Sequence, residues 1–138
     1  MQGAVTSSAE SELTRLIEIV AKLRGPDGCP WDREQTPQSM IPYLLEEAYE
    51  VVETLEDGDI AELQKELGDL LLHIVMQAQM AEEENTFKLR DSIYSINEKL
   101  IRRHPHVFGD NNNASKRIED ARENWERVKK SEGRKSWI

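Results

Sequence analysis

The sequence predicts an all-α fold, an antiparallel helical bundle of about five helices that homodimerisation completes. Leucine, glutamate, lysine and alanine are frequent, and these residues favour helices. Apolar residues recur at helical spacing, and no segment shows the period-two alternation of a strand. The 138 residues are enough for one domain with a modest core. We therefore expect one domain over residues 12–131, between tails at residues 1–11 and 132–138.

The charge and the cysteine content narrow the class of protein. A net charge of −9 argues against a general nucleic-acid surface, which needs a basic stripe. Cys29 is the single cysteine, so no internal disulfide can form, and this fits a reducing compartment. No apolar run reaches the length of a membrane span, and residues 1–10 lack the pattern of a signal peptide. We expect a cytoplasmic protein that binds neither nucleic acid nor a membrane.

The first predicted helix covers residues 12–24, where apolar side chains share one helical face. They are Leu13, Leu16, Ile17, Val20 and Leu23. Glycine and proline residues in the following segment, Gly25–Pro30, predict a turn-rich loop. Trp31 belongs to this loop.

The second predicted helix follows a proline-rich start. Thr36 before Pro37 suits an N-cap with proline in the first helical turn, and Pro42 predicts a kink or a restart near Tyr43. From Tyr43 to Glu56 the apolar residues occupy one arc of about 120°. The opposite arc carries Tyr43 with four carboxylates, namely Glu46, Glu47, Glu50 and Glu53.

The third predicted helix runs from Asp59 to about Glu84. Gly58 suits the C′ position of the preceding helix, and Asp59 suits the new N-cap, with Glu62 completing a capping-box pattern. The later segment Leu70–Met76 is apolar nearly all round, which is typical of a helix buried on several sides. A chain of this size has little material to cover it, so we expect subunit association.

Two further helices complete the prediction. Residues 88–103 form an amphipathic helix with Leu89, Ile93, Ile96 and Leu100 facing inward, and His104-Pro105 ends it. Residues 115–131 form a weaker, highly charged helix.

The carboxylates of the second and third helices predict a metal site. A short turn joins the helices, so they are antiparallel neighbours in which Glu50 faces Glu66 and Glu47 faces Asp69. Like charges this close repel unless a cation lies between them. Oxygen ligands favour Mg²⁺, with Mn²⁺ as a possible substitute. Gly68 beside Asp69 suggests the close approach of another group. The alternative is a solvated acidic face.

Basic residues gather at the end of the helix over residues 88–103. Lys99, Arg102 and Arg103 lie on its last turn, where the helix dipole favours positive charge in any case. They could equally bind phosphate oxygens, which arginine contacts in a bidentate manner. The residues alone leave both explanations open.

Four motifs in this order resemble the MazG family of nucleoside triphosphate pyrophosphohydrolases over roughly residues 12–130. The motifs are Gly28-Cys29-Pro30-Trp31-Asp32, Glu46-Glu47-x-x-Glu50, Glu66-Leu67-Gly68-Asp69 and Arg102-Arg103-His104-Pro105-His106-Val107-Phe108. Longer family members carry two copies of this domain. This chain has one copy, and its His-Pro-His-Val-Phe segment resembles the first copy more closely.

The resemblance implies an all-α homodimer or higher assembly that uses Mg²⁺ to cleave a nucleoside triphosphate between its α and β phosphates, as in cleansing of the nucleotide pool. The implied metal ligands are Glu47, Glu50, Glu66 and Asp69, and Glu46 is implied as a further ligand or as the residue that orients the attacking water. The implied substrate contacts are Lys99, Arg102, Arg103 and Trp125, with Trp31 either stacking on a base or covering a core edge. The alternatives are a related helical enzyme for dUTP or phosphoribosyl-ATP, and a non-catalytic dimerisation or regulatory module.

Overall fold

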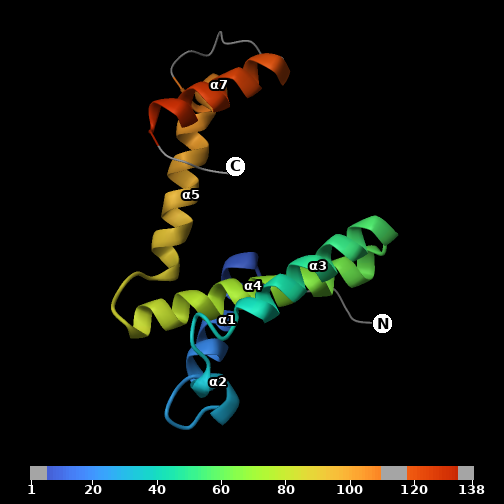
Figure 1. Cartoon of the computed structure of the whole chain (residues 1–138), viewed down its shortest axis with the longest axis vertical. Coiled ribbons are helices and arrows are strands. Elements are labelled where there is room, and N and C mark those ends of the chain that lie inside the picture. Colours follow the sequence, from blue (N-terminus) through green and yellow to red (C-terminus); the bar gives the residue numbers. More distant parts are fainter. Residues whose placement is uncertain (1–5, 110–117, 134–138) are drawn as a thin grey trace. The chain divides into compact units, whose positions relative to one another are not determined.

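The computed structural model describes residues 6–109 and 118–133, and every regular element in these ranges is a helix. The predicted all-α class is confirmed, with seven helices in the described residues where five were expected (Figure 1). The two additional helices, α2 (Pro30–Glu34) and α6 (Pro105–Phe108), are short. Helix α2 begins in the segment predicted as a loop, and α6 follows the predicted end of the helix over residues 88–103. None of the described helices has both the length and the apolar character needed to cross a membrane.

The chain divides into two compact units, Met1–Leu89 and Arg90–Ile138. The predicted extent of one domain over residues 12–131 and of its two tails stays a prediction. Helix α1 (Ala9–Leu23) begins inside the predicted first tail, because Ser8 and Ser11 form a reciprocal capping box. Residues 1–5 and 134–138 of the tails, and residues 115–117 of the last predicted helix, lie outside the described residues.

The core of the first unit lies between α1 and α4 (Ile60–Glu83), which pack against each other. Its buried members are Val20, Met40, Val75, Met76 and Met80. The predicted stripe of α1 is confirmed, since Leu13, Leu16 and Ile17 pack against this cluster. The helical spacing of these residues therefore identified the inner face of α1 correctly.

A tight loop turns the chain from α1 into α2. The Cys29 amide donates a hydrogen bond of 2.8 Å to the Leu23 carbonyl, which brings Gly28 against the end of α1. A Cβ atom at Gly28 would lie 2.1 Å from the Leu23 oxygen, so only glycine fits there without a shift of the backbone.

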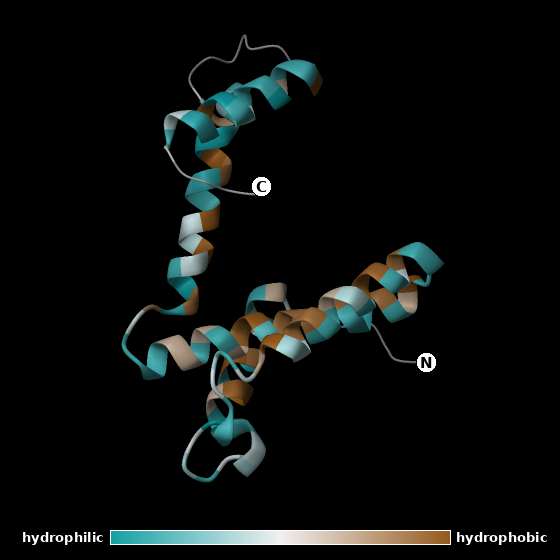
Figure 2. Cartoon of the chain, viewed as in Figure 1, coloured by the Kyte–Doolittle hydropathy of each residue, from teal (hydrophilic) through white to brown (hydrophobic). Residues whose placement is uncertain are grey.

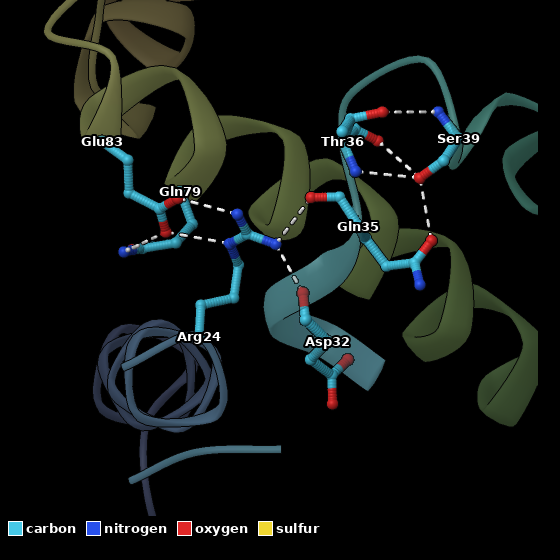
Figure 3. A network of polar contacts seen from close by, with 7 residues as sticks. All are labelled: Arg24, Asp32, Gln35, Thr36, Ser39, Gln79 and Glu83. Atoms are coloured by element: carbon cyan, nitrogen blue, oxygen red, sulfur yellow. Dashed lines mark hydrogen bonds and ion pairs between the residues drawn. The ribbon is translucent and has the colours of Figure 1, made fainter. Parts of the chain in front are cut away.

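Arg24 ties this loop to α4 (Figure 3). Its guanidinium donates to both carboxylate oxygens of Glu83, at 2.9 and 2.8 Å, and to the carbonyls of Asp32 and Gln35, at 2.5 and 3.1 Å. The Arg24 side chain is almost fully buried. One side chain therefore satisfies four acceptors and connects α1, α2 and α4.

The start of α3 (Ile41–Asp57) corrects one prediction. The Thr36 hydroxyl does accept a hydrogen bond from the Ser39 amide, but the helix begins only at Ile41, with Pro42 in its first turn. Thr36 therefore caps a separate turn, and the predicted restart near Tyr43 is confirmed because Pro42 cannot continue a helix from the preceding residues.

The turn between α3 and α4 matches the prediction. Gly58 adopts the left-handed conformation, with φ of 71°, and the Asp59 side chain accepts from the Glu62 amide as the N-cap of α4. Because the turn is short, α3 packs against the first part of α4, and the later part of α4 extends beyond α3 (Figure 1). This packing places the two acidic motifs opposite each other.

The face of α3 that lies against α4 is offset from its apolar arc. Val51 and Thr54 are buried, whereas Leu45, Val52 and Leu55 are 54%, 45% and 60% exposed. On α4, Leu71 and Ile74 are also exposed. Figure 2 accordingly shows hydrophobic residues along both helices. Most of the apolar arc of α3 therefore does not pack against α4 and is available to pack against another surface.

The second unit contains most of α5 (Leu89–Arg103), together with α6 and α7 (Ile118–Ser131). Helix α6 packs against α7. Ile93, Ile96 and Leu100, which were predicted to face inward, are exposed, so the described helices of this unit do not cover them as predicted. Helical spacing predicts which residues share a face, but it does not establish that an element of the same chain covers this face.

Candidate metal centre and basic cluster

Three carboxylates from two helices meet at one point of the first unit. Ligand oxygens of Glu47 on α3 and of Glu66 and Asp69 on α4 all lie within 4.8 Å of one another. Glu50, one turn after Glu47, belongs to the same group, since its carboxyl group interacts with those of Glu47 and Glu66. The structure thus brings together all four residues proposed as metal ligands.

The carboxyl groups of this cluster perturb one another, and no cation among the described residues is a cause of their pKa shifts. Hydrogen bonding between the Glu50 and Glu66 carboxyl groups, together with burial and the negative charges of Glu50 and Glu47, raises the pKa of Glu66 to about 7. Burial and the charges of Glu50 and Asp69 raise the pKa of Glu47, although its hydrogen bond with Glu66 acts in the opposite direction. Protons therefore bind to this cluster more tightly than to ordinary carboxylates.

Two oxygen atoms of the cluster have chemistry that suits a cation. One carboxylate oxygen of Glu47 and one of Glu66 are buried and have no hydrogen-bond partner among the described residues. A buried acceptor without a partner is costly, and a bound hard cation removes this cost through coordination. The all-oxygen donor set suits Mg²⁺ or Mn²⁺ better than zinc or iron.

Several nearby residues do not join the cluster. Glu46 is exposed and is not among the three carboxylates that meet. His73, one turn beyond Asp69, is buried and also lies outside this group. A Cβ atom at Gly68 would meet nothing within 4 Å, so the close approach expected there is not provided by the described chain.

The three basic residues of α5 differ in their surroundings. Arg103 is fully buried, with its guanidinium 4.7 Å from the centre of the Trp125 ring, and it forms an ion pair of 3.0 Å with Glu132. Arg102 donates to the other oxygen of the Glu132 carboxylate. Lys99 is half-buried. Direct contact of Arg103 with a phosphate would require this side chain to move.

Glu132 is the residue of this cluster that sequence reasoning missed. It lies in the predicted second tail, directly after α7, and is 30 and 29 residues from Arg102 and Arg103. Its two arginine partners lower its pKa to about 2, so the carboxylate is charged at neutral pH. No spacing rule within one helix signals a contact over this distance.

The proposed base contact, Trp31, lies on α2 and is about half exposed. Its ring packs edge-on against Tyr43 of α3, with 5.9 Å between the ring centres. Tyr43 stands one helical turn before Glu47 on the same face. An accessible aromatic pair therefore lies beside the carboxylate cluster.

A sequence-family model described as the MazG nucleotide pyrophosphohydrolase domain matches residues 35–108, which include the acidic cluster and the basic end of α5. The chain belongs to the MazG family. The match confirms the resemblance that the four motifs indicated. The MazG assignment thus includes all four clustered carboxylates but excludes Trp31, Trp125 and Glu132.

Curated relatives extend the match beyond this MazG segment. The nucleoside triphosphate pyrophosphohydrolase/pyrophosphatase MazG of Thermotoga maritima is 53% identical over 95 residues, which are 69% of this chain and 37% of the relative. A nucleoside triphosphate pyrophosphohydrolase of Escherichia coli is 44% identical over 123 residues, which are 88% of this chain and 46% of the relative. The chain therefore spans less than half the length of either protein.

One solved structure supports the fold directly. The crystal structure of a mazG-related protein from Thermotoga maritima aligns with a TM-score of 0.69 and 30% sequence identity. The alignment covers 85% of this chain and 98% of the other. The helical arrangement described above is thus shared with a MazG-related protein of similar extent.

Proposed function

We propose that this chain hydrolyses nucleoside triphosphates between the α and β phosphates, releasing a nucleoside monophosphate and pyrophosphate in the cytoplasm. The observation that carries the proposal is the convergence of Glu47, Glu66 and Asp69 in a chain of the MazG family. The longer relatives from Thermotoga maritima and Escherichia coli are named nucleoside triphosphate pyrophosphohydrolases, which supports the same reaction class.

In this proposal the carboxylates of Glu47, Glu50, Glu66 and Asp69 hold Mg²⁺, or Mn²⁺ in its place. When bound, the ion supplies positive charge to phosphate oxygens and lowers the pKa of a coordinated water. Glu46 is exposed, one residue before Glu47, and is proposed to orient the attacking water or to serve as a further ligand.

Other residues are proposed to contact the phosphate groups and the base of the nucleotide. Lys99 and Arg102 donate hydrogen bonds to phosphate oxygens and stabilise charge on the leaving pyrophosphate. Trp31, with its exposed ring, offers a stacking surface for the base. Trp125 and Arg103 pack on each other, so their contribution to the substrate site is indirect unless the pair opens.

The test is product analysis over a panel of canonical and modified nucleoside triphosphates, dUTP and phosphoribosyl-ATP included, with Mg²⁺ or Mn²⁺. Monophosphate and pyrophosphate in equal amounts support the proposal, and Glu50→Ala or Asp69→Ala is expected to abolish turnover while helical circular dichroism is retained. Glu53→Ala is the matched control, because this exposed glutamate of α3 is not among the clustered carboxylates. If Glu50→Ala or Asp69→Ala retains full activity, the substituted residue is not a metal ligand.

We also propose that the chain forms a homodimer or a higher homo-oligomer. The large apolar side chains left exposed on α3 and α4 support this, since a contiguous apolar surface marks an interface. They include Leu45, Tyr49, Val52, Leu55, Leu67, Leu71 and Ile74. Sedimentation velocity of the wild type and of Leu55→Glu tests it, with Glu53→Lys as the control on the polar face. A wild-type monomer at micromolar concentration would contradict the proposal.

A further inference from the structure

Glu132 joins two arginines that differ strongly in exposure. Its carboxylate accepts from Arg103 through one oxygen, at 3.0 Å, and from the Nε atom of Arg102 through the other. The Arg103 side chain is 0% exposed, that of Glu132 is 11% exposed and that of Arg102 is 44% exposed. The carboxylate thus connects a buried guanidinium with one that reaches the surface.

The buried side of this chain of contacts is held by packing. The Arg103 guanidinium lies over the Trp125 ring, and this ring packs edge-on against His104 with 5.2 Å between the ring centres. These contacts come from α5, the start of α6 and α7. Because Arg103 is held on several sides, the Glu132 carboxylate that it binds has a defined position.

The exposed side retains hydrogen-bonding capacity. A guanidinium has five N–H donors, and Glu132 takes only the one on Nε of Arg102. The two terminal nitrogens of Arg102 make no hydrogen bond to any residue in the described ranges. Lys99 lies three residues earlier, hence on the same face of α5, and it forms no ion pair with the described residues.

We propose that Glu132 is a positioning residue that orients Arg102 for binding a phosphate group of the substrate. The inference rests on the proposed function and deepens its account of substrate binding. A free arginine side chain loses rotamer freedom when it binds, and a partner that holds its Nε edge beforehand reduces that loss. The charge needed for this persists in solution, since the pKa of Glu132 lies at about 2.

The test is a double-mutant cycle on KM with ATP and Mg²⁺. Glu132→Gln keeps the size of the side chain and removes its charge, and it is expected to raise KM by about fivefold while kcat stays within about twofold. In an Arg102→Ala background the same change is expected to alter KM by less than about twofold, because the positioned group is absent. Glu123→Gln, an exposed charge removal on α7, is the control that leaves KM unchanged.

Thermal unfolding separates positioning from a purely structural role. Both predict a lower Tm for Glu132→Gln, but only positioning predicts the change in KM and its disappearance without Arg102. Glu132→Asp, which retains the charge, serves where Glu132→Gln does not fold, and it is expected to give a KM between those of the wild type and Arg102→Ala. An unchanged or lowered KM, or independent effects of the two substitutions, would overturn the inference.

A binding experiment distinguishes failure of this inference from failure of the proposed function. The affinity of each variant for inorganic tripolyphosphate with Mg²⁺, measured by calorimetry, is expected to follow the same non-additive pattern. If the variants show this pattern of tripolyphosphate binding but the wild type cleaves no nucleotide, the proposed function is wrong and the role of Glu132 stands. Wild-type protein that binds no tripolyphosphate would overturn the role of Glu132.

Discussion

Protonation of Glu66 offers a quantitative test of the carboxylate cluster. Its pKa of about 7 in the metal-free protein means that it is about half protonated at pH 7, about nine-tenths at pH 6 and about one-tenth at pH 8. A cation needs the ionised form, so binding of Mg²⁺ displaces this proton. The apparent dissociation constant for Mg²⁺ is therefore expected to rise roughly tenfold between pH 8 and pH 6.

Calorimetry in two buffers with different ionisation enthalpies counts the released protons directly. We expect about half a proton from Glu66 for each cation bound at pH 7 and about 0.9 at pH 6. Glu66→Gln removes this titration, whereas Glu53→Gln makes the same change of charge at an exposed site of α3 that is not among the clustered carboxylates. If no proton is released at pH 7 and the affinity for Mg²⁺ does not vary from pH 6 to 8, Glu66 does not carry a proton that the cation displaces.

The same pKa makes a prediction about stability without metal. A carboxyl group whose pKa is raised from 4.5 to about 7 on folding binds its proton more tightly in the folded state. Its contribution to stability is therefore full below pH 4.5 and is lost as pH rises through about 7. Thermal unfolding in the presence of a chelator is expected to show this decline in the wild type, and added Mg²⁺ to reverse it at pH 8. A decline of the same size in Glu66→Gln would contradict the assignment.

Three substitutions test the local structure by urea unfolding. Arg24→Ala removes the partner of Glu83 and of two carbonyls, and we expect a loss of about 2 kcal/mol. Arg15→Ala, in a surface ion pair, is expected to cost less than about 0.5 kcal/mol. Equal losses would contradict the importance of the Arg24 network. Gly28→Ala is expected to lower the free energy of unfolding by about 2 kcal/mol, because its Cβ would overlap the end of α1. A variant as stable as the wild type would show that the loop shifts without cost. Gly58→Ala places a side chain at φ of 71° and is expected to lower the free energy of unfolding by about 1 kcal/mol, whereas Gly58→Asn is expected to lower it by less. A larger loss for Gly58→Asn than for Gly58→Ala would rule out left-handed backbone strain as the cause.

Short-range rules account for the parts of the fold that were predicted. The stripe of α1, the proline that starts α3 and the Gly58-Asp59 turn each depend on residues within a few positions of one another. The facing of Glu47 and Asp69 follows from the same turn, since a short connection leaves an antiparallel arrangement as the natural one. The short helices α2 and α6 were not predicted, because each has too few residues to show a periodic pattern.

The all-α class, the family and the pair of helices that carries the acidic motifs could all be predicted from the sequence, because they depend on local propensity, spacing and motif order. Three features became visible only in the folded chain. Helix α3 meets α4 through a face offset from its apolar arc, the pKa of Glu66 is raised to about 7, and Glu132 binds Arg102 and Arg103. Burial, desolvation and ion pairs about 30 residues apart are properties of packed surfaces, and no local pattern in the chain specifies them.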